Sequence, residues 1–232
     1  LHRFYISQPL GEVVVIRDSS VLKQWKNVFR YTTGSSVVVF NGDGYEYVST
    51  IESITTHECT VRQISKSLSY IPSKKVTLYL SLIKKDNFAF VVQKATELGI
   101  TAIVPIISER SEKKNLNDER LQKIAIEASE QCGRGDIPKI SPIVKLTDVF
   151  QTINTDTPSI ILNMDGISVS SAEMQGILGK GNDVNLFIGP EGGWSESEVN
   201  NFREKAFVTI SLGKTVLRAE TAAITACALT CI

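Results

Sequence analysis

The chain has 232 residues, of which 42% are hydrophobic, and this is enough to bury a substantial core in one or two domains. No apolar run approaches the roughly 20 residues that a bilayer-spanning helix needs, and the first residues lack a charged-then-apolar signal pattern. We therefore expect a soluble protein of the cytoplasm. The scarcity of histidine and the absence of a CxxC pair disfavour a metal site. We predict free, buried thiols at the four cysteines, Cys59, Cys132, Cys227 and Cys231.

The formal net charge is zero, but the charges are distributed unevenly. Residues 1–70 carry 7 Lys/Arg and 6 Asp/Glu, and residues 71–145 carry 13 and 9. Residues 146–232 are acidic, with 5 Lys/Arg and 10 Asp/Glu. A basic first part suits a polyanionic partner, although an ordinary solvated surface can have the same composition.

Residues 1–70 are typical of a small β-barrel, a fold that often binds nucleic acid. A helix is expected from about Ser20 to Arg30, and Asn41-Gly42-Asp43-Gly44 is a strong hairpin turn. Runs of β-branched and aromatic residues predict strands at Glu12–Ile16, Val37–Phe40, Tyr45–Glu52 and Cys59–Ile64. The basic side chains that could meet phosphates, or could simply form a solvated helix face, are Arg3, Arg17, Lys23, Lys26 and Arg30.

Ser65–Lys75 is rich in serine and contains a proline, which is typical of a linker; we place the domain boundary at residues 71–75. The second domain, residues 76–232, is expected to be α/β. Val76–Ile83 is a continuous β run and Ala102–Ile107 is the next buried strand, and between them Asp86 or Asn87 can cap a helix that stops at Gly99. This βαβ pattern predicts a parallel sheet with a right-handed crossover.

The same alternation continues to the last residue of the chain. After the polar loop Ser108–Lys114, helices are expected from Asn117 or Asp118, over Asp148–Ile153, over Ser170–Leu178, from Ser195 and over Ala219–Ile232. Strands are expected at Ser159–Met164, Val184–Ile188 and Phe207–Leu212.

Three of the strands end in short polar or glycine-bearing loops, which are Asp165-Gly166, Gly189–Gly193 and Gly213–Arg218. Loops at one edge of an α/β sheet can together form a ligand pocket. Glycine lets a ligand approach the main chain, so a side chain at Gly192 is expected to block the ligand. Ser195 and Glu198 have the spacing of a helix capping box.

Common nucleotide and hydrolase motifs are missing. No GxGxxG follows a strand, and there is no GxSxG elbow. Gly213-Lys214-Thr215 imitates the end of a phosphate-binding loop, but Val208 stands where the first glycine is needed. Arg218 and Glu220 flank the start of the last helix, where they could form a surface ion pair or hold an anionic group.

Taken together, these segments resemble the SPOUT class of methyltransferases and, more narrowly, the RsmE family, which methylates N3 of a uridine in small-subunit ribosomal RNA. The pieces that carry the resemblance stand in family order across nearly the whole chain: HRFY at His2–Tyr5, KATELGI at Lys94–Ile100, SERS at Ser108–Ser111, EQCGR at Glu130–Arg134, IGPEGGW at Ile188–Trp194 and LGKTVLRAETAA at Leu212–Ala223.

The resemblance implies a PUA-like RNA-binding β-barrel at residues 1–70 and a SPOUT domain with a trefoil knot at residues 76–232. It implies a homodimer that acts on 16S ribosomal RNA and binds S-adenosylmethionine in the knot, without a metal. The residues that would bind this cofactor are Leu162, Ile188, Gly189, Pro190, Glu191, Gly192, Gly193, Leu212, Gly213, Val216, Leu217 and Thr221.

Methylation of uridine N3 needs a base or cationic donors, because N3 carries a proton at neutral pH. Arg218 and Arg134 are the candidates for stabilising the uridine anion, and Glu220 could act as the base or orient Arg218. Arg3, Arg30 and Arg110 are the candidates for contacting RNA. Two alternatives stay open: a related SPOUT enzyme acting on another RNA or position, and a non-catalytic RNA-binding assembly factor.

Overall fold

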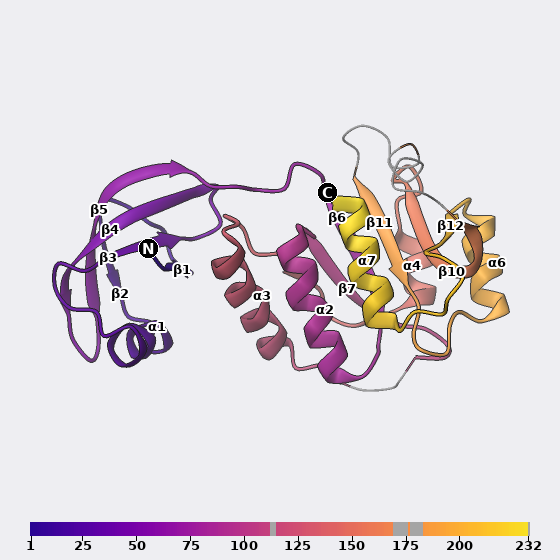
Figure 1. Cartoon of the computed structure of the whole chain (residues 1–232), viewed down its shortest axis with the longest axis horizontal. Helices are drawn as coiled ribbons and strands as arrows, with labels where there is room; N and C mark the ends of the chain where they lie inside the picture. The colour runs from indigo at the N-terminus through magenta and orange to yellow at the C-terminus, as the bar shows by residue number, and fades with distance from the viewer. Residues whose placement is uncertain (112–114, 169–175, 177–182, 232) are drawn as a thin grey trace. The chain divides into compact units, whose positions relative to one another are not determined.

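The computed structural model describes residues 1–111, 115–168, 176 and 183–231 (Figure 1). The chain forms two compact units, Leu1–Ile71 with Ser129–Ile137 and Pro72–Ala128 with Pro138–Ile232. The helix expected over Ser170–Leu178 lies, apart from Gly176, outside the described residues. None of the helices in the described part of the chain is long and apolar enough to cross a membrane.

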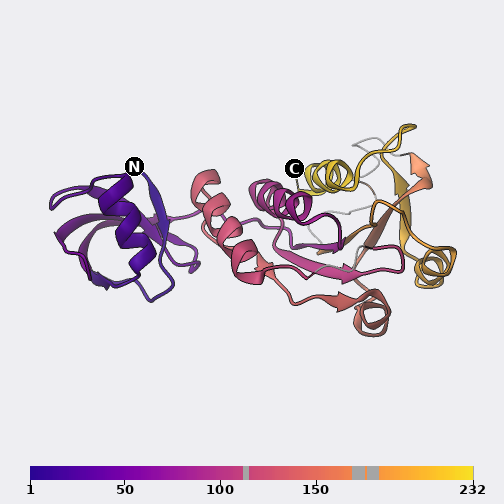
Figure 2. The same cartoon turned by 90° about the horizontal axis from the view of Figure 1, so that it is seen from below.

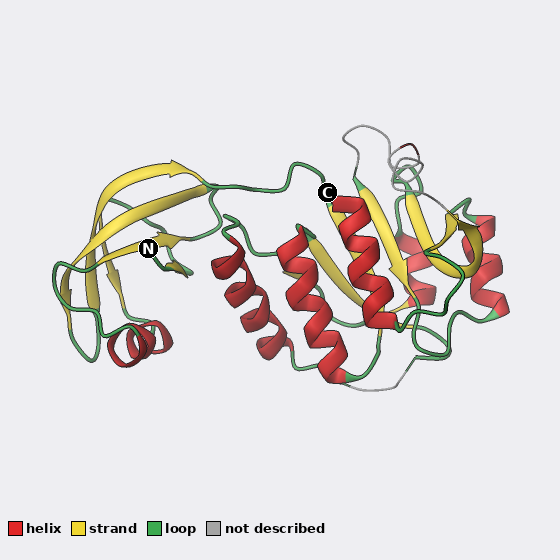
Figure 3. Cartoon of the chain, viewed as in Figure 1, coloured by secondary structure: helices red, strands yellow, loops and turns green. Residues whose placement is uncertain are grey.

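A curled five-stranded sheet forms the first unit (Figure 3). Its order is β1-β3-β4-β5-β2, in which β1 runs parallel to β3 and the other neighbours are antiparallel. The predicted turn at residues 41–44 joins β3 to β4, with Gly42 and Gly44 at positive φ. The strands are β1 (Arg3–Tyr5), β2 (Val13–Ile16), β3 (Ser36–Phe40), β4 (Tyr45–Ile54) and β5 (Cys59–Leu68).

One helix packs on this sheet, but it is shorter and less regular than predicted. Asp18 caps α1 (Ser19–Lys23) by accepting from the Ser20 amide at 2.8 Å. A π-helical turn, η1 (Gln24–Val28), follows, and Arg30 lies beyond it at φ 53°. The prediction of one helix from Ser20 to Arg30 was therefore wrong at its end. The wider turn lies where Trp25 is fully buried, packed edge-on against Phe4 in the core.

The second unit is built on a seven-stranded sheet in which all neighbours are parallel. The order is β12-β10-β11-β6-β7-β8, and β9 also pairs with β7. Parallel strands covered on both faces are continuous apolar runs, which is why most of them were predicted. The strands are β6 (Val76–Ser81), β7 (Ala102–Ile107), β8 (Lys139–Ile140), β9 (Val144–Lys145), β10 (Ser159–Ser168), β11 (Val184–Ile188) and β12 (Val208–Ser211).

Helices cover both faces of this sheet. Figure 2 shows α2 (Lys85–Leu98) and α7 (Ala219–Cys231) on one face, with α4 (Leu146–Thr152) and α6 (Glu196–Glu204) on the other. The remaining long helix is α3 (Asp118–Cys132). Helix α2 begins after Lys84 without a side-chain cap, so the predicted capping role of Asp86 or Asn87 was wrong, and Asp86 instead lies in the first turn, where a negative charge favours the helix dipole.

The thiols differ in exposure. Cys59 and Cys227 are buried, whereas Cys231 is partly exposed. Cys132 is exposed because it is the last residue of α3, so the prediction of a buried thiol there was wrong. Burial raises the pKa of Cys59 to about 11 and raises the pKa of Cys227 well above its ordinary value. No cluster of potential metal ligands occurs among the residues that the structure describes.

Candidate active site and RNA-binding residues

A cavity of ≈ 330 Å³ lies at the carboxyl ends of β10, β11 and β12. This volume falls within the range of roughly 300–1,000 Å³ that is typical of small-molecule sites. Three segments supply most of the wall: the middle of β10 at Leu162–Met164, the loop after β11 at Ile188–Trp194, and the segment from Ile210 to Ala219. Because parallel strands end at one edge of a sheet, the predicted loops after β11 and β12 meet there. The predicted end of the third strand at Asp165-Gly166 was wrong, because β10 continues to Ser168 and lines the cavity with Leu162–Met164.

The loop after β11 is a tight turn closed by Trp194. The Gly193 amide donates to the Pro190 carbonyl at 2.8 Å, and Gly193 has φ 68°, which favours glycine. The indole Nε1 of Trp194 donates to the Leu162 carbonyl at 3.0 Å, which ties this loop to β10. A Cβ on Gly189 would lie 3.1 Å from the indole ring, so the glycine leaves room for the ring.

The segment after β12 is shaped by another glycine. Gly213 has φ 135° and open space where a Cβ would stand. The Ser211 hydroxyl donates to the Gly213 carbonyl at 3.0 Å and so closes this turn. Gly213 therefore serves the conformation of the loop.

The end of β10 is irregular. Its pairing with β12 shifts between Leu162 and Ile167, since both of these residues align with Ile210. The residues between them leave the ladder, and Asn163 and Met164 line the cavity. A Cβ on Gly166 would lie only 2.4 Å from the carbonyl carbon of Ile210, so the chain can pass this strand only as glycine.

Nine of the twelve predicted cofactor residues line the cavity, namely Leu162, Ile188, Gly189, Pro190, Glu191, Gly193, Leu212, Val216 and Leu217. Gly192, Gly213 and Thr221 are not part of the lining. At Gly192 a Cβ would lie 3.2 Å from the Arg110 Cβ. The space that glycine leaves at this position is therefore used by an arginine of the neighbouring loop.

Eight lining residues were not predicted, and they are Asn163, Met164, Trp194, Ile210, Ser211, Thr215, Ala219 and Ala222. The indole of Trp194 had a signal in the sequence, since it ends the motif Ile188–Trp194. The small residues of α7 had none, because an alanine gives no hint of whether it faces a ligand or another helix.

Among the described residues, the cavity lining has one basic and one acidic side chain, Arg218 and Glu191. Arg218 is exposed at the start of α7, where its carbonyl accepts the Ala222 amide at 2.9 Å. None of the ion pairs between described residues involves Arg218. Glu220 lies in the first turn of α7 and is not part of the lining, so among the described residues Glu191 is the carboxylate that lines the cavity.

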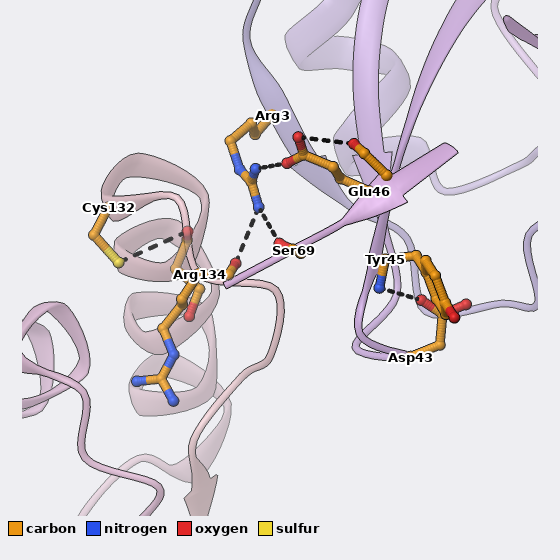
Figure 4. Close-up of polar contacts among 9 residues, drawn as sticks. Arg3, Asp43, Tyr45, Glu46, Ser69, Cys132 and Arg134 are labelled. Atoms are coloured by element: carbon orange, nitrogen blue, oxygen red, sulfur yellow. Dashed lines mark hydrogen bonds and ion pairs between the residues drawn. The ribbon is translucent and has the colours of Figure 1, made fainter. Parts of the chain in front are cut away.

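Two predicted site arginines are held in the first unit (Figure 4). The Arg3 guanidinium is ion-paired with Glu46 and donates to the Arg134 carbonyl at 3.1 Å. The Arg134 side chain points away from Arg3, is 2% exposed, and pairs with Asp136 through two hydrogen bonds of 2.9 and 2.8 Å. Both guanidinium groups thus have structural partners, and their roles toward RNA stay predictions.

The remaining arginines predicted to bind RNA are on the surface. Arg30 is exposed at the end of the π-helical turn. Arg110 is exposed in the loop after β7, where its Nη1 donates to the Gly192 carbonyl at 3.2 Å. Arg110 is therefore attached to the loop that lines the cavity.

Family models match both parts of the chain. An RNA methyltransferase domain matches residues 71–231, and an RNA methyltransferase PUA domain matches residues 26–64. The fold and the cavity thus define the class: an RNA methyltransferase with a PUA domain.

Comparison with individual proteins narrows this class. The ribosomal RNA small subunit methyltransferase E of Rickettsia conorii is 30% identical over 98% of this chain and 93% of its own length. The enzyme of the same name from Bacillus subtilis is 31% identical over 84% of this chain and 81% of its own. The chain belongs to the ribosomal RNA small subunit methyltransferase E family, as the resemblance predicted.

Solved structures agree with this assignment. The enzyme of this name from Neisseria gonorrhoeae, bound to S-adenosyl methionine, superposes with a TM-score of 0.88 at 28% identity, covering 98% of this chain and 95% of its own. A protein from Legionella pneumophila, in complex with the same cofactor, gives a TM-score of 0.85 at 29% identity, covering 98% of this chain and 96% of its own. The predicted fold class is confirmed, whereas the trefoil knot stays a prediction.

Proposed function

We propose that this protein transfers a methyl group from S-adenosylmethionine to N3 of a uridine in 16S ribosomal RNA. The observation that carries the proposal is the cavity formed by the ends of β10, β11 and β12. Membership of the methyltransferase E family and the cofactor bound in two similar structures support it.

The residues of the cavity fit this cofactor. A nucleoside needs apolar contacts for the faces of its base and main-chain groups for its polar edge. Apolar side chains such as Leu162, Leu212 and Leu217 line the cavity, and the turn at Pro190–Gly193 brings the backbone of Gly193 to its surface. We infer that these residues hold S-adenosylmethionine, which supplies the methyl group and carries its own leaving group.

The remaining work of the protein is electrostatic and positional. Uridine N3 becomes nucleophilic when it loses its proton, and the negative charge then spreads to the neighbouring carbonyl oxygens. A guanidinium donates charge-assisted hydrogen bonds to such oxygens. We assign this role to Arg218, because it lines the cavity without an acidic partner among the described residues.

Proton removal can be assigned by comparing two carboxylates. Glu191 lines the cavity, whereas Glu220 does not. We therefore expect Glu191→Gln to lower kcat more than Glu220→Gln, by up to the ~100-fold typical of a general base. A larger loss in Glu220→Gln would instead assign the proton to Glu220. In either case the acceptor uridine must be unpaired or flipped out, because pairing hides N3.

We also propose that the enzyme is a homodimer in the cytoplasm, where it meets the small ribosomal subunit or its RNA. Two large apolar side chains that line the cavity support the dimer, since exposed apolar groups can mark contact surfaces. Met164 and Val216 are 46% and 81% exposed. Sedimentation equilibrium should give twice the mass of the chain, and cell fractionation should find the protein in the cytoplasmic fraction.

Two measurements test the proposed activity. Calorimetric titration with S-adenosylmethionine should give saturable binding by the purified protein. Mass mapping of nucleosides should then find 3-methyluridine in 16S ribosomal RNA only when the protein is present. Cofactor uptake without methylation would favour another RNA or position as the target, and absence of uptake would favour a non-catalytic RNA-binding factor.

A further inference from the structure

Glu198 is a buried carboxylate, and the capping box accounts for only one of its two oxygens. Its side chain lies in the first turn of α6 and is 7% exposed. No ion pair between described residues involves it. A buried carboxylate without a cation needs hydrogen bonds to offset its lost hydration, so the donors that it has found indicate what it does.

The two carboxylate oxygens accept from two different loops. Oε2 accepts the Ser195 amide at 2.8 Å, which is the capping-box bond. Oε1 accepts the Glu109 amide at 2.8 Å, which comes from the loop after β7. The second bond adds nothing to the helix cap, and it connects α6 to a segment 89 residues earlier in the chain.

The loop that Glu198 holds is itself a compact turn. The Ser108 amide donates to the Ser111 hydroxyl at 3.1 Å, and that hydroxyl donates to the Ser108 carbonyl at 2.8 Å. The Ser108 hydroxyl is buried and donates to Ser81 at the end of β6. With one side fixed to the sheet and the other to Glu198, the turn presents Arg110 in a defined direction.

Together with the chain from Gly192 to Glu198, these hydrogen bonds form a closed cycle that includes part of the cavity wall. Arg110 donates to the Gly192 carbonyl at 3.2 Å, and from there the chain runs through Trp194 to Ser195 and back to Glu198. Trp194, which lines the cavity, is part of this cycle. Displacement of Glu198 therefore removes the Glu109 bond that holds the Arg110 turn, and with it weakens the contact of that turn with the glycine loop.

We propose that Glu198 is a positioning residue that holds the Ser108–Ser111 turn against the Gly189–Gly193 loop, so that the cofactor wall is formed before the ligand arrives. This inference rests on the proposed function, since it names the residue that prepares the same cavity. Preorganisation of this kind raises affinity because the loop no longer has to be ordered on binding.

Glu198→Gln tests the proposal because glutamine has one acceptor oxygen where glutamate has two. One of the two loops must lose its bond, and we expect the Kd for S-adenosylmethionine to rise about tenfold, the scale of one hydrogen bond to a charged group. Glu196→Gln is the matched control, because Glu196 is exposed in the same turn of α6 and its loss changes the charge equally. Its Kd should stay within about twofold of wild type, whereas equal effects of the two variants would overturn the proposal.

A double-mutant cycle with Arg110→Ala separates positioning from simple loss of stability. If Glu198 acts through the Arg110 turn, the double variant binds the cofactor no more weakly than the weaker single variant, within about twofold. Additive losses would overturn the proposal. Ser195→Ala removes the cap hydroxyl but keeps the backbone amide that Glu198 accepts, so it should lower the melting temperature and leave the Kd unchanged.

If Glu198→Gln does not fold, hydrogen exchange on the wild-type enzyme tests the bond between the Glu109 amide and Glu198 directly. The Glu109 amide should exchange at least ~100-fold more slowly than an unbonded loop amide, because a buried carboxylate accepts it. Exchange at the unbonded rate would contradict the bridge. Failure of the wild type to bind S-adenosylmethionine would overturn the proposed function, whereas binding with an unaffected Glu198→Gln would overturn only the positioning role.

Discussion

Trp194→Phe should weaken both the second unit and its cofactor site. The substitution removes the bond of 3.0 Å from the indole Nε1 to the Leu162 carbonyl. It also shrinks a ring that packs edge-on against Phe202, with centroids 5.0 Å apart. The phenyl ring keeps the aromatic contact but cannot tie the glycine loop to β10.

The size of the effect follows from these two losses. A hydrogen bond of this kind contributes ~1 kcal/mol, and the smaller ring forgoes roughly another 1 kcal/mol of apolar burial. A loss of ~2 kcal/mol lowers the melting temperature of a unit of this size by about 4–8 °C. We expect the Kd for S-adenosylmethionine to rise about tenfold, because the freed loop must be ordered again on binding.

Trp25→Phe is the control, since Trp25 is the other of the two tryptophans. Trp25 is fully buried in the first unit, and its indole Nε1 has no partner among the residues that the structure describes. Its replacement removes an unsatisfied donor together with some packing, and it should leave the cofactor Kd unchanged. The same variant leaves Trp194 as the sole tryptophan, which can be excited selectively in fluorescence titrations. A Trp194→Phe enzyme with wild-type affinity and melting temperature would refute this reasoning.

Arg218→Ala should keep cofactor affinity within about threefold while methyl transfer falls by ~100-fold or more, as in other sites that lose an anion-stabilising donor; single-turnover assays check this, and near-normal turnover would contradict the role. Gly166→Ala should destabilise the second unit by at least ~1–3 kcal/mol, because the new methyl group overlaps the backbone of Ile210; denaturant unfolding measures it, and unchanged stability would be the contrary result. Cys132 should react with a thiol reagent at pH 8 while Cys59, whose pKa is about 11, stays protected until unfolding. Because the folded Cys59 thiol keeps a proton that the unfolded chain releases near pH 9, its stabilising effect is full below pH 9 and is lost as the pH rises toward 11; constant stability across that range would exclude it.

Much of the second unit could be predicted because its strands are buried on both faces. Val76–Ile83 and Val184–Ile188 are mostly apolar runs, and the helix between β6 and β7 ends at Gly99, which has φ 102°. Strands of two or three residues, such as β8 and β1, are too short to show any period. Apolar periodicity also gave no sign of the π-helical turn at Trp25.

The position of the pocket was predictable, whereas the task of each glycine was not. Parallel topology places the ends of β10, β11 and β12 at one edge, and this was sufficient to bring the loops together. Yet Gly189 and Gly192 occupy one motif and make room for different neighbours, the ring of Trp194 and the Cβ of Arg110. A sequence reveals that a side chain is absent, but only coordinates reveal what occupies the space.

The charge partners of the predicted arginines could not be read from the sequence either. Residue type predicted five of them for the site, but residue type does not specify a partner. Arg3 and Arg134 have acidic partners within the first unit, and Arg110 donates to the Gly192 carbonyl. A guanidinium already neutralised by a carboxylate has little field left for a developing anion. Arg218 lines the cavity without such a partner among the described residues, and we therefore propose that its charge stabilises the uridine anion.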